Sequence, residues 1–315
     1  MSGRVAAVVS VLVVLGVATV AAAVVVLPRE TADPGTGAAR ISTAPAPSDP
    51  ATPAPTRRTQ STRAGTTLEP CPRSAAQRLT VLTLNIHSGR TKAGRVELGR
   101  LASELRSWDA DLVLLQEVDR GRERTDGVDQ ARRLAGRLVY SHVFGPTRQF
   151  RPGSTGNAIL SRWPVVDTRL RALPREVGTY RRGLARATVD VDGQQVDVFS
   201  THLDHTAPGV RRAQARAVAA SVRRSPRPVV LGGDLNAEPG TPAVRAVERV
   251  GLVDGWSAVG RHDGLTVPAA SPRRRIDFVL ADDDFVPVRS RVLLSSVSDH
   301  RAVMTTYDLL PRECD

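Results

Sequence analysis

The sequence predicts a mixed α/β domain that follows an apolar membrane-spanning helix and a disordered linker. Short apolar runs alternate with segments of helical period, which is typical of α/β and α+β folds. Two of these runs, 185–191 and 195–201, are joined through Asp192-Gly193 and form a hairpin signal. We therefore expect a sheet with some antiparallel neighbours, rather than a purely parallel one.

The N-terminal segment, residues 1–27, is expected to be a membrane anchor or a signal segment. No charged residue lies between Val5 and Leu27, and at about 1.5 Å per residue such a helix can cross a bilayer. The run is longer than a usual signal core and lacks a clear cleavage site of small residues, which favours an uncleaved anchor. A cleaved signal, and hence a secreted protein, is the alternative.

Residues 28–70 are rich in Pro, Thr and Ala, as in Thr43-Ala44-Pro45-Ala46-Pro47. Such a composition cannot bury a core and predicts a disordered tether. Two cysteines, Cys71 and Cys314, bracket the remaining domain, residues 71–315. We expect them to form a disulfide in an oxidising compartment, with two unpaired thiols as the alternative. These expectations place a single-pass protein in the cell membrane with the domain of residues 71–315 outside the cytoplasm.

The composition favours an anionic partner. The formal net charge is +12, which suits nucleic acid, phospholipid or a phosphate ester. Lysine occurs once and asparagine three times, so a coding bias toward arginine could also raise the charge. Aromatic residues make up only 3% of the chain, which argues against a base-stacking surface for single strands.

Apolar runs and helical periodicity locate the elements of the domain. Strands are expected at 78–85, 111–117, 156–161, 185–191, 195–201, 228–233, 275–280 and 300–307. Helices are expected near 95–107, 128–138, 209–224 and 241–250. The first of these helices carries apolar residues on a period close to 3.6, including Val96, Leu98, Leu101 and Leu105.

The strongest local signal is the stretch from Val229 to Pro239. A buried strand ends at a double glycine, so Asp234 and Asn236 are expected on the turn beyond it. An acid and an amide two positions apart can accept a proton and stabilise an oxyanion, respectively. Ordinary turn chemistry is the competing interpretation. Asparagine is scarce in this chain, and all three asparagines adjoin short apolar runs. Both observations favour a functional role for Asn236 over ordinary turn chemistry.

Other predicted strands also end in acidic or histidine residues, which are common in catalytic and metal sites. Glu117 closes one apolar run, and His300 follows Asp299 before another. Asp277 lies inside an apolar run and needs a partner, because an unpaired buried carboxylate is costly. We expect that partner to be His300. Glu117 and Asp299 offer hard oxygen ligands, which suit Mg²⁺ or Mn²⁺.

Seven short motifs in order resemble those of the endonuclease/exonuclease/phosphatase superfamily, which includes DNase I-like nucleases. They are Thr83-Leu84-Asn85, Gln116-Glu117, Gly156-Asn157-Ala158-Ile159-Leu160-Ser161, Thr201-His202-Leu203, Gly233-Asp234-Leu235-Asn236, Arg275-Ile276-Asp277-Phe278 and Ser298-Asp299-His300. The resemblance covers about residues 78–307. It implies a four-layer α/β/β/α sandwich and a divalent-metal phosphodiesterase or phosphatase.

The resemblance also implies roles for individual residues. Glu117 is expected to be the main metal ligand, helped by Asn85 and Asp299. Asp234 is expected to orient or deprotonate the attacking water. Asn236 is expected to hold that water and the phosphoryl oxygens. These roles amount to positioning and charge neutralisation around an in-line displacement.

Two histidines complete the implied catalytic set. His300, paired with Asp277, and His202 are expected to stabilise negative charge on the phosphoryl group. The candidates for binding the substrate are Asn157, Arg181, Arg182 and Arg186. For the three arginines, a solvated basic loop and strand edge is the competing interpretation.

We therefore expect a nuclease-like endonuclease with a phosphodiester substrate, nucleic acid being favoured over phospholipid. The alternative within the enzyme class is a phosphodiesterase or phosphatase acting on phospholipid, sphingomyelin or inositol phosphate. A catalytically silent binding module is the alternative of another class. The sequence indicates the membrane as a partner, through the N-terminal helix, and points to no protein partner.

Overall fold

The computed structural model describes residues 75–311, and the strands among them form two six-stranded sheets. The first sheet has the order β11 (Phe285–Leu293), β12 (Ala302–Leu309), β1 (Gln77–Asn85), β2 (Leu112–Arg120), β4 (Ser154–Ser161) and β3 (Ser141–Gln149). The second has the order β5 (Val165–Ala172), β6 (Gly183–Val191), β7 (Gln194–His202), β8 (Val229–Asp234), β10 (Asp277–Ala281) and β9 (Val253–Asp254).

Both sheets are mixed, as the sequence predicted. The pairs β1–β2 and β7–β8 are parallel, whereas their other neighbours pair antiparallel. The hairpin of β6 and β7 turns through Asp192-Gly193, and both turn residues have a positive φ. Type I′ turns need this conformation at both central residues, which explains why Asp-Gly is a strong hairpin signal.

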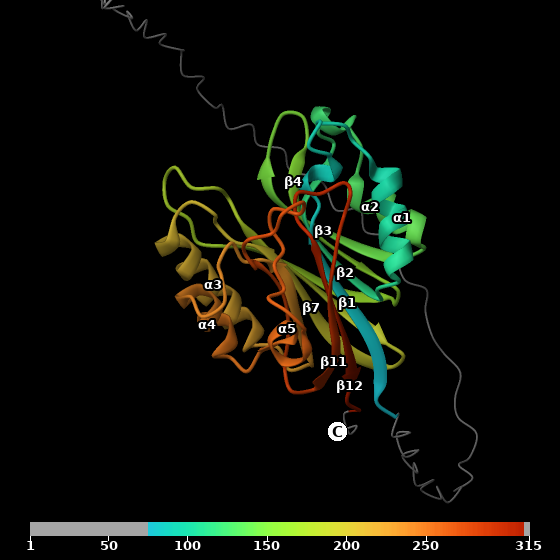
Figure 1. Cartoon of the computed structure of the whole chain (residues 1–315), viewed down its shortest axis with the longest axis vertical. Coiled ribbons are helices and arrows are strands. Elements are labelled where there is room, and N and C mark those ends of the chain that lie inside the picture. Colours follow the sequence, from blue (N-terminus) through green and yellow to red (C-terminus); the bar gives the residue numbers. More distant parts are fainter. Residues whose placement is uncertain (1–74, 312–315) are drawn as a thin grey trace, which may run out of the picture. The chain divides into compact units, whose positions relative to one another are not determined.

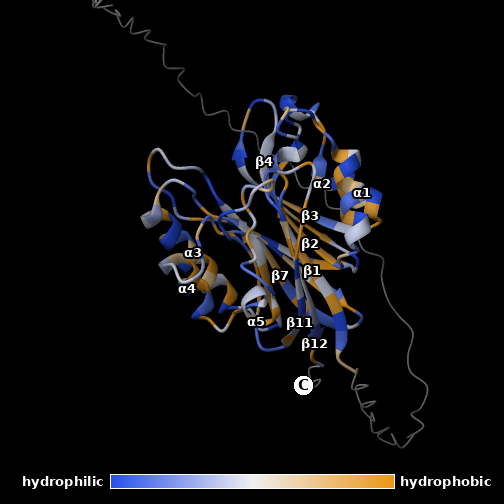
Figure 2. Cartoon of the chain, viewed as in Figure 1, coloured by the Kyte–Doolittle hydropathy of each residue, from blue (hydrophilic) through white to orange (hydrophobic). Residues whose placement is uncertain are grey.

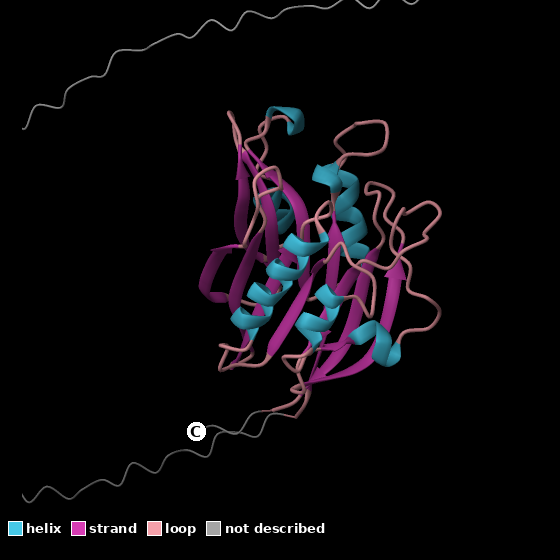
Figure 3. Ribbon diagram, turned by 90° about the vertical axis from the view of Figure 1, so that its left-hand side faces the viewer, coloured by secondary structure: helices cyan, strands magenta, loops and turns pink. Residues whose placement is uncertain are grey.

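The helices cover the outer faces of the two sheets (Figure 1). Helices α1 (Leu98–Trp108) and α2 (Gln130–Leu138) pack on the first sheet, and α3 (Pro208–Val222) and α4 (Pro242–Glu248) pack on the second. Figure 3 is turned so that α3 and α4 face the viewer in front of the strands. The layers are therefore α/β/β/α, the arrangement that the resemblance implied.

Three apolar clusters hold the layers together. One lies between the sheets and includes Leu79 and Leu114 of the first sheet and Val198 and Val230 of the second. The other two lie between each sheet and its helices. Figure 2 shows the resulting pattern, with hydrophobic colouring along the central strands and both colours on the helices. Burying each side of every sheet explains why the central strands consist of nearly continuous apolar runs.

Some elements differ from the expectation. The strands β3, β5, β9 and β11 and the short helices α5 (Gly255–Val259), η1 (His87–Gly89) and η2 (Glu123–Thr125) were not expected. β2 also runs beyond Glu117 to Arg120, across a register shift. The double glycine, expected to end a strand, lies inside β8.

The expected anchor (1–27), the linker (28–70) and the Cys71–Cys314 disulfide fall outside the described residues. Within residues 75–311, no helix combines the length and the apolar character that crossing a membrane requires. The anchor, the linker and the disulfide therefore stay predictions.

Candidate active site

Three polar residues lie next to one another across neighbouring strands of the second sheet. Asp234, the last residue of β8, is paired in register with His202 at the end of β7 and with Asp277 at the start of β10. The exposed fractions of the three residues are 1%, 5% and 0%, respectively. The strand register therefore brings one imidazole and two carboxylates together in a buried environment.

His300, from the loop before β12, completes what we call the acid–histidine group: His202, Asp234, Asp277 and His300. Its Nδ1 lies 2.9 Å from Asp277 Oδ2, and its Nε2 lies 3.8 Å from Asp234 Oδ2. The backbone N–H of His300 donates to Ser298 Oγ over 3.0 Å. The partner expected for the buried Asp277 is thus in place.

Burial and neighbouring charges shift the pKa values in this group in different directions. Burial disfavours the charged form of His300, but the carboxylates of Asp277 and Asp234 outweigh it and raise the pKa of His300 to about 10. Burial and the charge of Asp277 raise the pKa of Asp234 to about 7. Burial, helped by the charge of Arg182, holds the pKa of His202 well below its ordinary value. The group thus pairs a charged imidazole with a neutral one.

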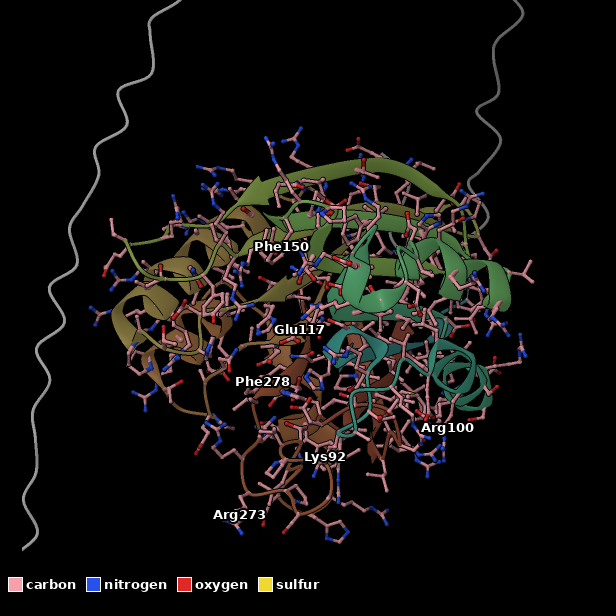
Figure 4. All side chains as sticks on the ribbon, turned by 90° about the horizontal axis from the view of Figure 1, so that it is seen from above. Lys92, Arg100, Glu117, Phe150, Arg273 and Phe278 are labelled. Atoms are coloured by element: carbon pink, nitrogen blue, oxygen red, sulfur yellow. The ribbon has the colours of Figure 1, made fainter. Side chains whose placement is uncertain are left out.

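Asn85 and Glu117 bring the first sheet into contact with this group. Asn85 Nδ2 donates to Glu117 Oε1 and to Asp234 Oδ2, each over 3.2 Å. Glu117 lies where the register of β2 shifts, and its φ of 55° is left-handed. A bulge of this kind re-aims a side chain at a local cost in backbone energy. Figure 4 looks down on the molecule with Glu117 near the centre of the view.

The donor set at this end of the sheets fits a hard divalent cation. Glu117 and Asn85 supply oxygen ligands of the kind that Mg²⁺ prefers. Carboxylate oxygens of Asp234 and Asp277 lie within 4.8 Å of each other and of a ring nitrogen of His300, and Asp277 Oδ1 is buried with no hydrogen-bond partner in the described part of the chain. The site therefore combines a glutamate and an asparagine of one sheet with a buried acidic and imidazole group.

Two other predicted residues have their own contacts. Asp299 is partly exposed, and its Oδ1 lies 3.9 Å from Nδ1 of His87. Asn236, with a left-handed φ of 49°, donates from its backbone N–H to Asp234 Oδ1 and from its side chain to the carbonyl of Leu203. Asn236 thus fixes the turn that follows Asp234, because asparagine tolerates this backbone conformation.

The four predicted substrate-binding residues separate in space. Arg182 interacts electrostatically with the site: burial lowers its pKa, and the carboxylates of Asp234 and Glu117 oppose that shift. Arg181 is exposed and lines a cavity of about 190 Å³ together with Arg182. The guanidinium of Arg186 instead forms ion pairs with Asp167 and Asp197, and the structure does not bring it to the group.

The remaining candidate, Asn157, lies between the two sheets. Its Nδ2 donates to the carbonyl oxygen of Gly183 over 2.9 Å, and its exposed fraction is 2%. Gly183 directly follows Arg182, so Asn157 fixes the backbone from which that arginine extends.

Sequence reasoning missed several neighbours of the site. Ser298 accepts from the His300 backbone and donates to the carbonyl of Asn85, so it links two strand ends. The Ser298-Asp299-His300 motif contained it, but nothing in the motif indicated its contacts. Arg148 also escaped notice, although its charge acts on Arg182. No linear signal connects β3 with the loop before β6, because only the fold brings them together.

Two face-to-face sheets, with a buried acid–histidine group and a glutamate of the other sheet at one end, define a phosphoesterase class of protein. The family model described as the endonuclease/exonuclease/phosphatase family matches residues 82–300. The chain belongs to this family, as the motifs predicted. Members of the family are hydrolases of phosphoester bonds and typically depend on a divalent metal.

Individual relatives agree with this assignment. A solved endonuclease/exonuclease/phosphatase structure from Beutenbergia cavernae is 30% identical, has a TM-score of 0.62, and is matched over 74% of this chain and 72% of that one. YbhP of Escherichia coli K12, described as uncharacterized, is 30% identical over 50% of this chain and 66% of YbhP, less than two thirds of its length. A mannosyl-6-phosphatase from Bacteroides thetaiotaomicron, 18% identical with a TM-score of 0.60 over 72% of this chain and 98% of that one, shares the fold.

Proposed function

We propose that this protein is a divalent-metal-dependent phosphodiesterase that cleaves nucleic acid as an endonuclease. The observation that carries the proposal is the contact between the acid–histidine group and Glu117 through Asn85, whose amide lies 3.2 Å from both carboxylates. It places a metal-ligand candidate beside a candidate base. The net charge of +12 favours a polyanionic substrate.

In this proposal Glu117 and Asn85 hold Mg²⁺ or Mn²⁺, and Asp299 contributes a third oxygen ligand. When bound there, the cation supplies charge neutralisation to the phosphate oxygens. Asn85 also donates to Asp234, so it sets the distance between the ligands of the cation and the candidate base.

The protein's own groups then act on the water and the phosphate. Asp234 orients the water and accepts its proton as the water oxygen bonds to phosphorus. Asn236 holds the turn of Asp234 and contacts the phosphoryl oxygens. His300, kept charged by Asp277, gives a proton to the leaving oxygen when the old phosphorus–oxygen bond breaks. His202, as a neutral imidazole, donates a hydrogen bond to a phosphoryl oxygen.

We further propose that residues 1–27 anchor the protein in the cell membrane and that the linker holds the catalytic domain outside the cytoplasm. The uncharged run from Val5 to Leu27 and the two cysteines support this location. Protease treatment of intact cells tests it. We expect loss of the catalytic domain from cells whose cytoplasmic proteins stay intact, whereas full protection would overturn the proposed location.

The function is tested by incubating the purified full-length protein with Mg²⁺, Mn²⁺ or chelator on supercoiled plasmid DNA and on phospholipid vesicles. We expect nicking of the plasmid that chelator abolishes. Release of lipid head groups with intact DNA would assign the enzyme to the phospholipid alternative. The absence of metal-dependent hydrolysis of either substrate would favour a binding module or a smaller phosphate ester.

A further inference from the structure

Five side chains beside the active site form a row in which cations and aromatic rings alternate. The row runs in the order Arg122, Phe150, Arg148, Tyr180 and Arg182. The guanidinium carbons lie 3.4 and 4.8 Å from the ring centre of Phe150, and 4.7 and 5.7 Å from that of Tyr180. We call these five residues the arginine row. Guanidinium groups at such distances are attracted by the ring faces, so the rings hold the three charges apart at fixed positions.

The three arginines of the row make no direct contact with an acid in the described residues. In residues 75–311, none of them forms an ion pair with a carboxylate, whereas Arg124 and Arg275 pair with Asp119 and Asp254. The Nε atoms of Arg122 and Arg182 are buried and have no hydrogen-bond partner within that range. Buried donors without a partner are costly, so these two guanidinium groups keep unmet hydrogen-bonding capacity.

One end of the row contacts His205 and lies close enough to the acid–histidine group for charges to interact. Arg182 Nη2 lies 3.3 Å from His205 Nδ1, and the rings of Tyr180 and His205 are 5.0 Å apart. The charge of Arg182 interacts with those of Asp234 and Glu117. A phosphate bound at Arg182 would therefore be next to the phosphate undergoing cleavage.

We propose that Arg122, Arg148 and Arg182 bind successive phosphates of a nucleic-acid strand beside the bond that is cleaved. Three guanidinium groups that two rings hold in succession, without ion pairs to carboxylates in the described residues, suit a ligand with several successive phosphates, whereas a phosphomonoester offers only one. Guanidinium groups already lie over both rings, so the row recognises the backbone of the strand rather than its bases. This inference rests on the proposed function and adds the strand-binding residues.

Binding can be measured separately from cleavage. The full-length protein is titrated into a labelled 12-nucleotide single-stranded DNA in chelator, at several KCl concentrations, and fluorescence anisotropy is recorded. For Arg148→Ala we expect about fivefold weaker binding at low salt. Since single strands lose affinity with a log–log slope of about 0.7 per phosphate contact, the salt slope should fall by about that amount.

Two further variants separate binding from folding. Arg148→Lys keeps the charge, so we expect it to recover most of the salt slope. Arg289→Ala removes an exposed arginine from β11, where it lines a cavity of about 800 Å³ that contains none of the predicted site residues. This matched variant should bind DNA as the unaltered protein does. The melting temperature of each variant shows whether it is folded.

A small chromogenic diester, bis(4-nitrophenyl) phosphate, separates the row from the catalytic residues. Arg148→Ala should raise KM for the DNA strand and leave kcat for the small diester unchanged. Equal loss on both substrates, or equal effects of Arg148→Ala and Arg289→Ala on binding, would overturn the assignment of the row. Binding that depends on Arg148 for anionic vesicles but not for DNA would overturn it in favour of a membrane surface.

The two proposals can fail separately. If DNA is cleaved in a metal-dependent way and Arg148→Ala changes neither binding nor cleavage, the arginine row does not bind the strand, and the proposed function still holds. Binding of DNA that depends on Arg148, without metal-dependent hydrolysis of any substrate, would refute the proposed function and keep the row as a strand-binding site.

Discussion

At the scale of single residues, the site depends on carboxylates that are held in place from several sides. Asp234 contacts Asn85 over 3.2 Å, His202 over 3.4 Å and His300 over 3.8 Å. Its Oδ1 also accepts the backbone N–H of Asn236. A carboxylate fixed by four neighbours loses little freedom when it engages a water molecule, which is the preorganisation that general base catalysis needs.

The first prediction concerns Asp234. Asp234→Asn keeps the shape of the side chain but removes the base, so kcat should fall by about 10²–10⁴-fold. Steady-state kinetics on a small phosphodiester measures the change. Asp283→Asn, an exposed acid between β10 and β11, is the matched control and should leave kcat unchanged. Full turnover by Asp234→Asn would exclude the proposed base.

The second prediction concerns the metal. Glu117→Gln keeps the size of the side chain and its ability to form hydrogen bonds but removes its charge. Loss of a partner of a metal ligand typically weakens metal affinity by about 10–100-fold, so loss of the ligand itself should cost at least about tenfold. A titration of activity with Mg²⁺ gives the concentration at half-maximal rate. An unchanged half-maximal concentration would show that Glu117 is not a ligand.

At the scale of elements, the double glycine of β8 brings strands and sheets close together. A Cβ on Gly233 would lie 2.1 Å from the carbonyl oxygen of Thr201 on β7, and one on Gly232 would lie 2.5 Å from Leu114 in the other sheet. Glycine here serves a close approach rather than a turn. The strand therefore continues to Asp234, which the close pairing holds opposite His202.

The third prediction follows from that approach. Gly233→Ala should lower the free energy of unfolding by about 1–3 kcal/mol, because the added methyl group must displace backbone atoms. Chemical denaturation measures it. Gly136→Ala is the matched control, since Gly136 lies in α2 with nothing within 4 Å of an added Cβ. It should instead stabilise by about 0.5–1 kcal/mol. Equal effects of the two variants would contradict the packing argument.

The strands that the sequence failed to predict share one property: all four lie at sheet edges. β11 and β3 border the first sheet, and β5 and β9 border the second. Edge strands face solvent and tolerate proline, as at Pro146 in β3 and Pro287 in β11. Prolines and polar or charged residues interrupt their apolar runs, whereas the central strands, buried on both faces, are visible as continuous apolar runs. Hydrophobic pattern therefore predicts the core of each sheet and not its borders.

The same reasoning explains how much of the site was predictable. The acid–histidine group and Glu117 lie at the ends of central strands, where a polar residue after an apolar run is easy to see. The arginine row lies on β3 and on loops, and its members meet only after the sheets pack. Arg186 shows the opposite error, because closeness along the chain did not mean closeness in space. It lies a few residues after Arg182, but its guanidinium pairs with Asp167 and Asp197.

At the scale of the whole molecule, polar contacts cross the interface between the sheets close to the site. Gln116 Nε2 donates to Ser200 Oγ over 3.3 Å, and Asn157 Nδ2 donates to the carbonyl of Gly183 over 2.9 Å. Buried polar groups in an otherwise apolar interface fix one relative position of the layers, because any shift would leave them unpaired. The two halves of the site are thereby aligned.

The fourth prediction tests that alignment. Asn157→Ala removes one of two side-chain donors to the carbonyl of Gly183, the other being Thr201 Oγ1, so the free energy of unfolding should fall by about 0.5–1.5 kcal/mol. Denaturation and steady-state kinetics are compared on the same preparation. If Asn157 contacts the substrate directly, KM should rise while stability stays unchanged. The Asp234→Asn variant gives the opposite reference pattern, in which activity is lost and the fold is kept.

The order of strands along the chain has a consequence for engineering. The strands of the second sheet, β5 to β10, form one continuous stretch of the chain, which is inserted between the two parts of the first sheet. Gln77 at the start of β1 pairs with Leu309 at the end of β12, so the two ends of the first sheet's sequence lie side by side. A circular permutant that links residues 309 and 77 and opens at 162–164 would carry each sheet as one half of the chain. Asn85 and Glu117 would then travel in one half and Asp234 in the other. If such a protein were cut between the halves, the complete site would form only when both fragments had folded and associated.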